Sequence, residues 1–107
     1  MNFRHIIDGS ESRTEIEGFC YATDSEETVF LTKMALVKII DRFLAQDISD
    51  VDLEAIAEAL DANERVVFEN EYRQLITDGL FSLSSTEING PLSAERVSSV
   101  RASICGN

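Results

Sequence analysis

The sequence has few of the residues on which catalytic and metal sites commonly depend. It contains one histidine, two cysteines, one proline and no tryptophan among 107 residues. Basic residues are also few, since nine Lys and Arg stand against 20 Asp and Glu and give a formal net charge of −11. Contacts to nucleic-acid phosphates and to anionic membrane lipids both need Lys or Arg, so this balance argues against either kind of partner.

Long apolar runs and cysteine motifs are also missing. Hydrophobic residues make up 44% of the chain, enough for the core of a single domain over residues 1–107. No run approaches the roughly 20 apolar residues that cross a bilayer, and the N-terminus lacks the apolar segment of a secretory signal. Cys20 and Cys105 form no CxxC motif, which favours two reduced thiols. We therefore expect a cytoplasmic protein.

Apolar periodicity predicts an all-α fold, a compact bundle of about four helices after an irregular N-terminal segment, residues 1–23. Within that segment, the weak alternation of Ile16–Ala22 fits a strand, a helical turn or neither. The first helix is predicted from Asp24 to about Gln46. Asp24 and Glu27 have capping-box spacing, and apolar residues cover more than half of the helix circumference.

The second helix is predicted from Ser49 or Asp50 to around Asp61. Its core side has the i, i+3, i+4, i+7 pattern, carried by Leu53, Ile56, Ala57 and Leu60. The third helix is predicted over Glu64–Leu83 with Asn63 as its cap, and Gly79 marks either close helix packing or a stop.

The last part of the chain is predicted to turn and then form a fourth helix. Asn-Gly-Pro within Thr86–Leu92 forbids helix continuation. Ser93 is the expected cap of the last helix, whose core side carries Val97, Val100 and Ile104. Residues 104–107 are expected to be a frayed tail.

Negative charge is concentrated in the middle third of the chain. Residues 47–78 carry ten acidic and two basic residues, a net charge of −8 out of −11. Much of this charge forms one stripe along the second predicted helix, made of Asp50, Glu54, Glu58 and Asp61, with Asp47 just before it. Each pair of like charges at i,i+4 destabilises a helix by about a few tenths of a kcal/mol. The stripe is either a solvated face or a docking surface for a basic partner.

No catalytic or cofactor motif accompanies this stripe. Asp47 and Glu58 have the spacing of the first and last ligands of a calcium loop, but Val51 and Asp52 occupy positions that need a ligand and a glycine. The sequence has no Glu-x-x-His motif, phosphate-binding loop or zinc spacing. His5 lies in a polar segment without a nucleophile beside it. We therefore expect no enzyme activity, no cofactor and no metal.

Residues 34–97 resemble small bacterial immunity proteins, especially those paired with contact-dependent growth inhibition toxins. The matching pieces are the acidic segment Asp52–Leu60, the Val67-Phe68-Glu69 segment, and Glu87–Leu92 followed by Ser93 and Glu95. The resemblance implies a cytoplasmic protein that binds one cognate toxin domain and blocks its activity, and it implies no catalytic residues.

The acidic stripe independently suits such a role, because a nuclease toxin needs a basic cleft to hold phosphates. The predicted partner-binding residues are Asp47, Asp50, Glu54, Glu58 and Asp61, with Glu69 and Asp78 as secondary candidates. Two other classes stay open: an acidic helical adaptor or regulator of another basic protein, such as a DNA-binding protein, and a small enzyme or metal-dependent carboxylate site.

Overall fold

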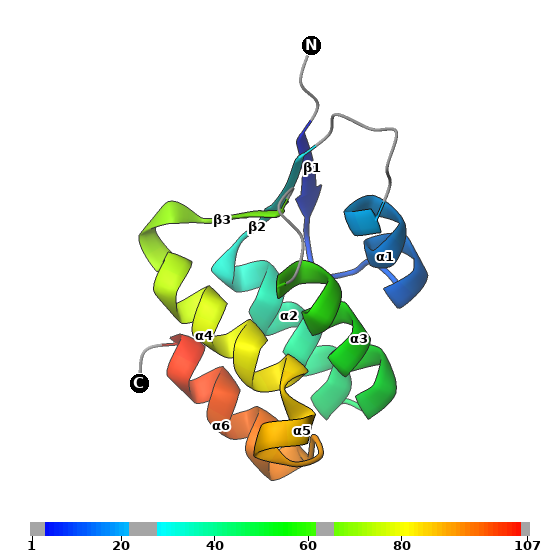
Figure 1. The fold of residues 1–107 in the computed structure, drawn as a ribbon, viewed down its shortest axis with the longest axis vertical. Coiled ribbons are helices and arrows are strands. Elements are labelled where there is room, and N and C mark those ends of the chain that lie inside the picture. The colour runs from blue at the N-terminus through cyan, green and yellow to red at the C-terminus, as the bar shows by residue number, and fades with distance from the viewer. Residues whose placement is uncertain (1–3, 22–27, 62–65, 106–107) are drawn as a thin grey trace.

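A computed structural model describes residues 4–21, 28–61 and 66–105, which form an α/β fold (Figure 1). The strands are β1 (Arg4–Ile7), β2 (Thr28–Leu31) and β3 (Val66–Phe68). The helices are α1 (Arg13–Tyr21), α2 (Lys33–Leu44), α3 (Asp50–Asp61), α4 (Arg73–Ser84), the single turn α5 (Thr86–Asn89) and α6 (Ala94–Cys105), with a 3-10 turn η1 (Asn70–Tyr72) before α4. The prediction of an all-α bundle was wrong, because a small sheet stands at one end of the helices.

The three strands form a parallel sheet in the order β1-β2-β3. Helix α1 connects the first two strands, and α2 and α3 connect the second to the third. Side chains alternate between the faces of a sheet, so Ile7 and Leu31 are buried. The register aligns Ile6, Phe30 and Val67 in one row on the opposite face. The helices thus provide a core for one face of the sheet.

The predicted first helix proved to be a strand followed by a shorter helix. Thr28–Leu31 pairs with both neighbouring strands, and α2 begins only at Lys33. The hydroxyl of Thr32 caps α2 by accepting a hydrogen bond from the Ala35 N–H at 3.1 Å. The predicted cap Asp24 lies outside the described residues. A continuous apolar run concealed the boundary, because helices and buried strands both tolerate such runs.

Two further predictions of secondary structure were wrong. The predicted helix over residues 64–83 contains β3 and η1 before α4 begins at Arg73; its predicted cap Asn63 lies outside the described residues. The N-terminal segment is not irregular, since β1 pairs with β2 and α1 buries Ile16 and Cys20 in the core. Partners distant in sequence therefore decided the structure of these segments.

The predictions for α3 and α6 were confirmed. Helix α3 spans Asp50–Asp61 and buries the four predicted apolar residues, and Ser93 caps α6 through its hydroxyl and carbonyl oxygens. Gly79 marks close packing, since a Cβ there would lie 2.7 Å from Cδ1 of Ile104. Ile104 is buried within α6, so the predicted frayed tail cannot begin there. Residues 106–107 lie outside the described residues, and the predicted turn after Thr86 opens with the short helix α5.

Candidate functional site

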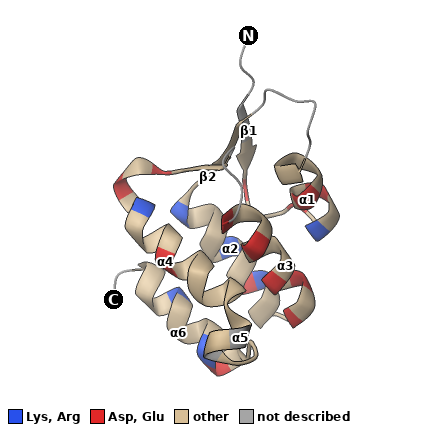
Figure 2. Cartoon of the chain, viewed as in Figure 1, with Lys and Arg blue, Asp and Glu red and all other residues tan. Residues whose placement is uncertain are grey.

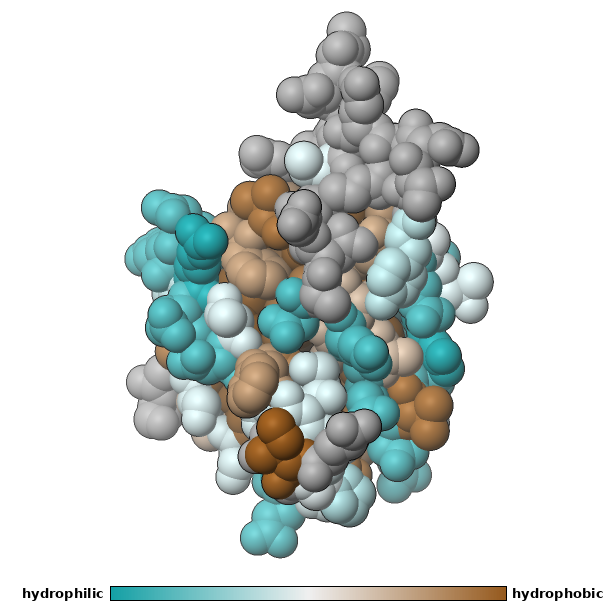
Figure 3. All heavy atoms as spheres, viewed as in Figure 1, coloured by the Kyte–Doolittle hydropathy of each residue, from teal (hydrophilic) through white to brown (hydrophobic). Residues whose placement is uncertain are grey.

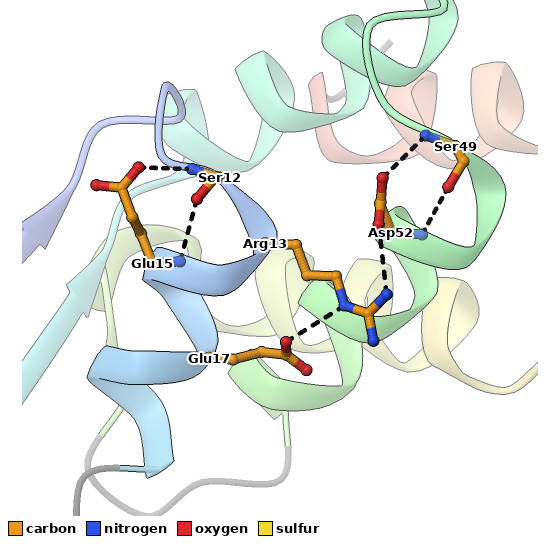
Figure 4. A network of polar contacts seen from close by, with 6 residues as sticks. All are labelled: Ser12, Arg13, Glu15, Glu17, Ser49 and Asp52. Atoms are coloured by element: carbon orange, nitrogen blue, oxygen red, sulfur yellow. Dashed lines mark hydrogen bonds and ion pairs between the residues drawn. The ribbon is translucent and has the colours of Figure 1, made fainter.

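Helix α3 begins with a reciprocal cap, and an arginine of α1 contacts this cap (Figure 4). The Ser49 hydroxyl accepts a hydrogen bond from the Asp52 N–H at 3.1 Å, and the Asp52 carboxylate accepts one from the Ser49 N–H at 3.4 Å. Arg13 of α1 donates to the same carboxylate at 3.4 Å and to Glu17 at 3.3 Å. These bonds lower the pKa of Asp52, the backbone hydrogen bond from Ser49 having the largest effect. Asp52 therefore has a basic partner, Arg13, within the described part of the chain.

The side of α3 that faces away from the core carries four carboxylates, which we call the acidic face: Asp50, Glu54, Glu58 and Asp61 (Figure 2). Glu54 is half-buried and the other three are exposed. Within the described part of the chain, none of the four forms an ion pair with a basic side chain. Their spacing places them one turn apart, so each carboxylate lies beside another of the same charge. The acidic face is therefore a strip of negative charge with no basic partner among the described residues.

The acidic face borders two adjoining hollows of about 340 and 330 Å³. Glu54 and Thr86 line both of them, and α5 with the turn after it forms the opposite wall. Apolar side chains lie at their edges, with Val51 60% exposed and Ile88 78% exposed. On the side of the molecule seen in Figure 3, hydrophobic side chains likewise interrupt a mainly hydrophilic surface. Exposed apolar groups among unpaired charges are typical of a surface that binds another protein.

Hydrogen bonds hold the opposite wall in place. The Thr86 hydroxyl donates to the Glu54 carboxylate and so joins α5 to α3. The Arg96 guanidinium donates to the carbonyl oxygens of Gly90 and Ser82, which ties the turn after α5 to α4 and α6. Gly90 has a φ of +89°, a conformation that a side chain would strain. Polar contacts to side-chain and backbone atoms therefore hold the wall.

Two titratable groups near the C-terminal half of the acidic face have raised pKa values. Loss of hydration raises the pKa of the Asp61 carboxyl, although the residue as a whole is exposed. Burial also raises the pKa of the Tyr21 phenol of α1, and the negative charge of Glu58 raises it further. Tyr21 is 53% exposed and adds an aromatic ring beside the C-terminal half of the acidic face.

The structure brings together four of the seven predicted partner-binding residues. Asp47 is exposed in the loop before α3 and lines a different hollow with Phe43 and Ile48. Glu69 is half-buried and accepts a hydrogen bond from the Lys33 N–H at 3.0 Å, so it satisfies a backbone donor in the first turn of α2. Asp78 is exposed on α4 and accepts a hydrogen bond from the Gln74 side chain at 2.9 Å. None of these three lines the hollows beside the acidic face.

Sequence reasoning missed the uncharged residues of this surface. Val51 interrupts the acidic stripe as an exposed apolar residue, and Thr86 and Ile88 come from a segment predicted only as a turn. The exposure of Val51 follows from its position, since it lies outside the apolar i, i+3, i+4, i+7 pattern of α3. The positions of Thr86 and Ile88 depend on how α4 packs on α3, for which the local sequence has no signal.

Among the described residues, no group of three or more His, Cys, Asp or Glu is arranged to hold a metal ion. None of the described helices is both long and apolar enough to span a membrane. Comparison with protein families, curated proteins and solved structures finds no match to this chain.

Proposed function

We propose that this chain is an immunity protein that binds and neutralises a cognate bacterial toxin domain without catalysis of its own. The toxin domain that we propose is a nuclease. The supporting observation is the acidic face, whose carboxylates have no basic partner among the described residues and border two hollows with apolar side chains at their edges. The resemblance of residues 34–97 to immunity proteins supports the same role.

A nuclease domain has the complementary surface, because its cleft must be basic to hold phosphates. Opposite charges steer two proteins together and speed their association, and screening by salt weakens this effect. Val51 and Ile88 give the surface the apolar contacts that stabilise a complex after docking. The acidic face would thus occupy the cleft or its rim and exclude the nucleic acid.

The test starts from a pull-down at low salt from the source bacterium, with mass spectrometry of the retained proteins. We expect one basic toxin domain, released when NaCl is raised from about 0.05 to about 0.5 M. Expressed alone, this domain should stop growth, and co-expression of the chain should restore it. A retained DNA-binding regulator with no toxicity would contradict neutralisation and indicate an adaptor.

Two double variants test whether the acidic face makes the contact. D50K/E58K reverses two carboxylates of that face, and E71K/E95K reverses two exposed carboxylates elsewhere. Both change the net charge from −11 to −7, because each reversal adds two, and Asp50 and Glu95 each lie in the first turn of a helix. We expect D50K/E58K to lose protection and E71K/E95K to keep it. Equal protection by both would place the contact elsewhere.

A further inference from the structure

Another hollow, of about 500 Å³, is lined mainly by residues of β1 and α2, and we call it the β1–α2 hollow. Its apolar part includes Ile6, 59% exposed, and Met34, 69% exposed, beside Val37. Four charged residues also line the hollow, namely Asp8, Lys38, Asp41 and Arg101. Exposed apolar side chains together with charged ones are found in many protein–protein contacts. The hollow shares no residue with the two beside the acidic face.

The wall formed by the end of β1 is fixed tightly to α2. Gly9 has a φ of +96°, and a Cβ there would lie 2.9 Å from the Ala35 carbonyl oxygen and 2.7 Å from Cβ of Lys38. Arg42 donates hydrogen bonds to the carbonyl oxygens of Gly9 at 3.0 Å and Glu11 at 2.7 Å. The hollow is therefore formed before any partner arrives, which reduces the entropy cost of docking.

Strand β1, whose residues line the hollow, is also an edge strand of the described sheet. Among the described strands, β1 pairs only with β2 and lies at the edge of the sheet. The backbone N–H and C=O groups on the other side of an edge strand are a template for pairing with another chain. Two edge strands related by a two-fold axis can pair in this way.

The charges of the hollow indicate which chain docks there. Its lining includes two acidic and two basic residues, and Arg101 pairs with Asp41 at 2.6 Å. A contact between two copies must be self-complementary, and a lining with both signs of charge meets this condition. Elsewhere two copies of a chain with net charge −11 repel each other, most of all at the acidic face. We infer that a second copy of this chain docks on the β1–α2 hollow as a two-fold dimer, with Met34 in the contact and the acidic faces free.

Sedimentation velocity of the whole chain from about 1 to about 100 μM tests this dimer. We expect dimers that grow with concentration, and stronger dimerisation when NaCl is raised from about 0.05 to about 0.5 M. Salt screens the repulsion between two negative chains but leaves the apolar contact, whereas it weakens binding of a basic toxin. A chain that stays monomeric throughout, or dimers that salt weakens, would overturn the inference and leave the proposed function untouched.

The matched variants are Met34→Glu in the hollow and Phe81→Glu on α4, where the ring is 53% exposed and lies outside the hollow. Both place one carboxylate on an exposed apolar position, and circular dichroism checks that each folds. We expect Met34→Glu to weaken dimerisation by about tenfold or more and Phe81→Glu to leave it near the wild-type value. Equal weakening by both would show a general charge effect and overturn the assignment of the contact.

Discussion

The two candidate surfaces are each bounded by a glycine turn that an arginine holds, and the two turns differ in how closely they pack. Gly9 follows Asp8, which lines the β1–α2 hollow, and Gly90 precedes Pro91, which lines one of the hollows beside the acidic face. Both have a positive φ, and both give their carbonyl oxygen to an arginine, Arg42 for Gly9 and Arg96 for Gly90. A Cβ at Gly9 would collide with α2, whereas a Cβ at Gly90 would meet nothing within 4 Å.

A glycine turn whose carbonyl oxygen is bound by an arginine therefore occurs beside two different kinds of surface. At the β1–α2 hollow, the turn touches the helix backbone, so van der Waals packing fixes the wall. At the acidic face, the turn is held from one side by hydrogen bonds, and the space around Gly90 is open. The first surface is rigid and balanced in charge, and the second is strongly negative and bounded by a less tightly packed turn.

The largest expected effect comes from adding a methyl group to each turn. Gly9→Ala should lower the free energy of unfolding by about 2 to 4 kcal/mol, because it combines a strained positive φ with overlap against α2. Gly90→Ala should cost only the strain, about 1 to 2 kcal/mol. Urea unfolding of both variants measures the difference. Equal losses would contradict the close approach of Gly9 to α2.

Removal of each arginine should have the next largest effect. Arg42→Met and Arg96→Met should each cost about 1 to 3 kcal/mol, because each removes two charge-assisted hydrogen bonds to backbone carbonyl groups. Urea unfolding gives these values, and Arg73→Met is the control, since Arg73 is exposed and lies outside these bonds. A loss no larger than that of the control would show that the turn does not depend on its arginine.

The two ends of α3 should respond oppositely to pH. The folded-state pKa of Asp52 is lowered, so its carboxylate stabilises the fold above its ordinary pKa of 3.8, and this contribution disappears as the pH falls through the folded-state value. Asp52→Asn should therefore destabilise the protein more at pH 7 than at pH 3. The pKa of Asp61 is raised, so its charged form opposes folding at neutral pH, and Asp61→Asn should stabilise the protein at pH 7.

Thermal unfolding at the two pH values measures both effects. Because both carboxyl groups are largely hydrated, we expect changes smaller than those from the arginine variants. An Asp52→Asn variant with the same loss of stability at both pH values would contradict the role of its carboxylate in capping α3.

The smallest expected effect concerns repulsion within the acidic face. Glu58→Gln should raise the free energy of unfolding by about 0.2 to 0.5 kcal/mol, because it removes like-charge neighbours one turn away. The gain should shrink in about 1 M NaCl, where the charges are screened. Urea unfolding at low and high salt measures it, with Glu71→Gln as the control on η1. A gain that salt leaves unchanged would have a cause other than charge.

Local sequence was sufficient for α3 and α6. In α3, the apolar residues repeat at helical intervals from Leu53 to Leu60, so the predicted bounds and core side were both correct. In α6, Ser93 supplied the cap signal. Each helix satisfies its own backbone hydrogen bonds, so neighbouring residues contain most of the information that defines it.

The sheet could not be predicted in the same way. Val29, Leu31 and Val66 satisfy their backbone groups through strands that lie far away in sequence, and their short apolar segments also fit a helix. The candidate site likewise has a part that the local sequence predicts and a part that it does not. The acidic face was predictable because its four carboxylates belong to one helix, whereas Thr86 and Ile88 reach it only through the packing of α4 on α3.

The sequence by itself determined the negative charge, its concentration in the middle third, and the amphipathic pattern of α3, because composition and helical spacing are local properties. Only the tertiary structure decided that three short segments form a parallel sheet, that the acidic face borders two hollows, and that Met34 lies exposed beside Ile6. These features arise where segments distant in sequence meet, and the contacts that decide among the possible arrangements exist only in the folded chain.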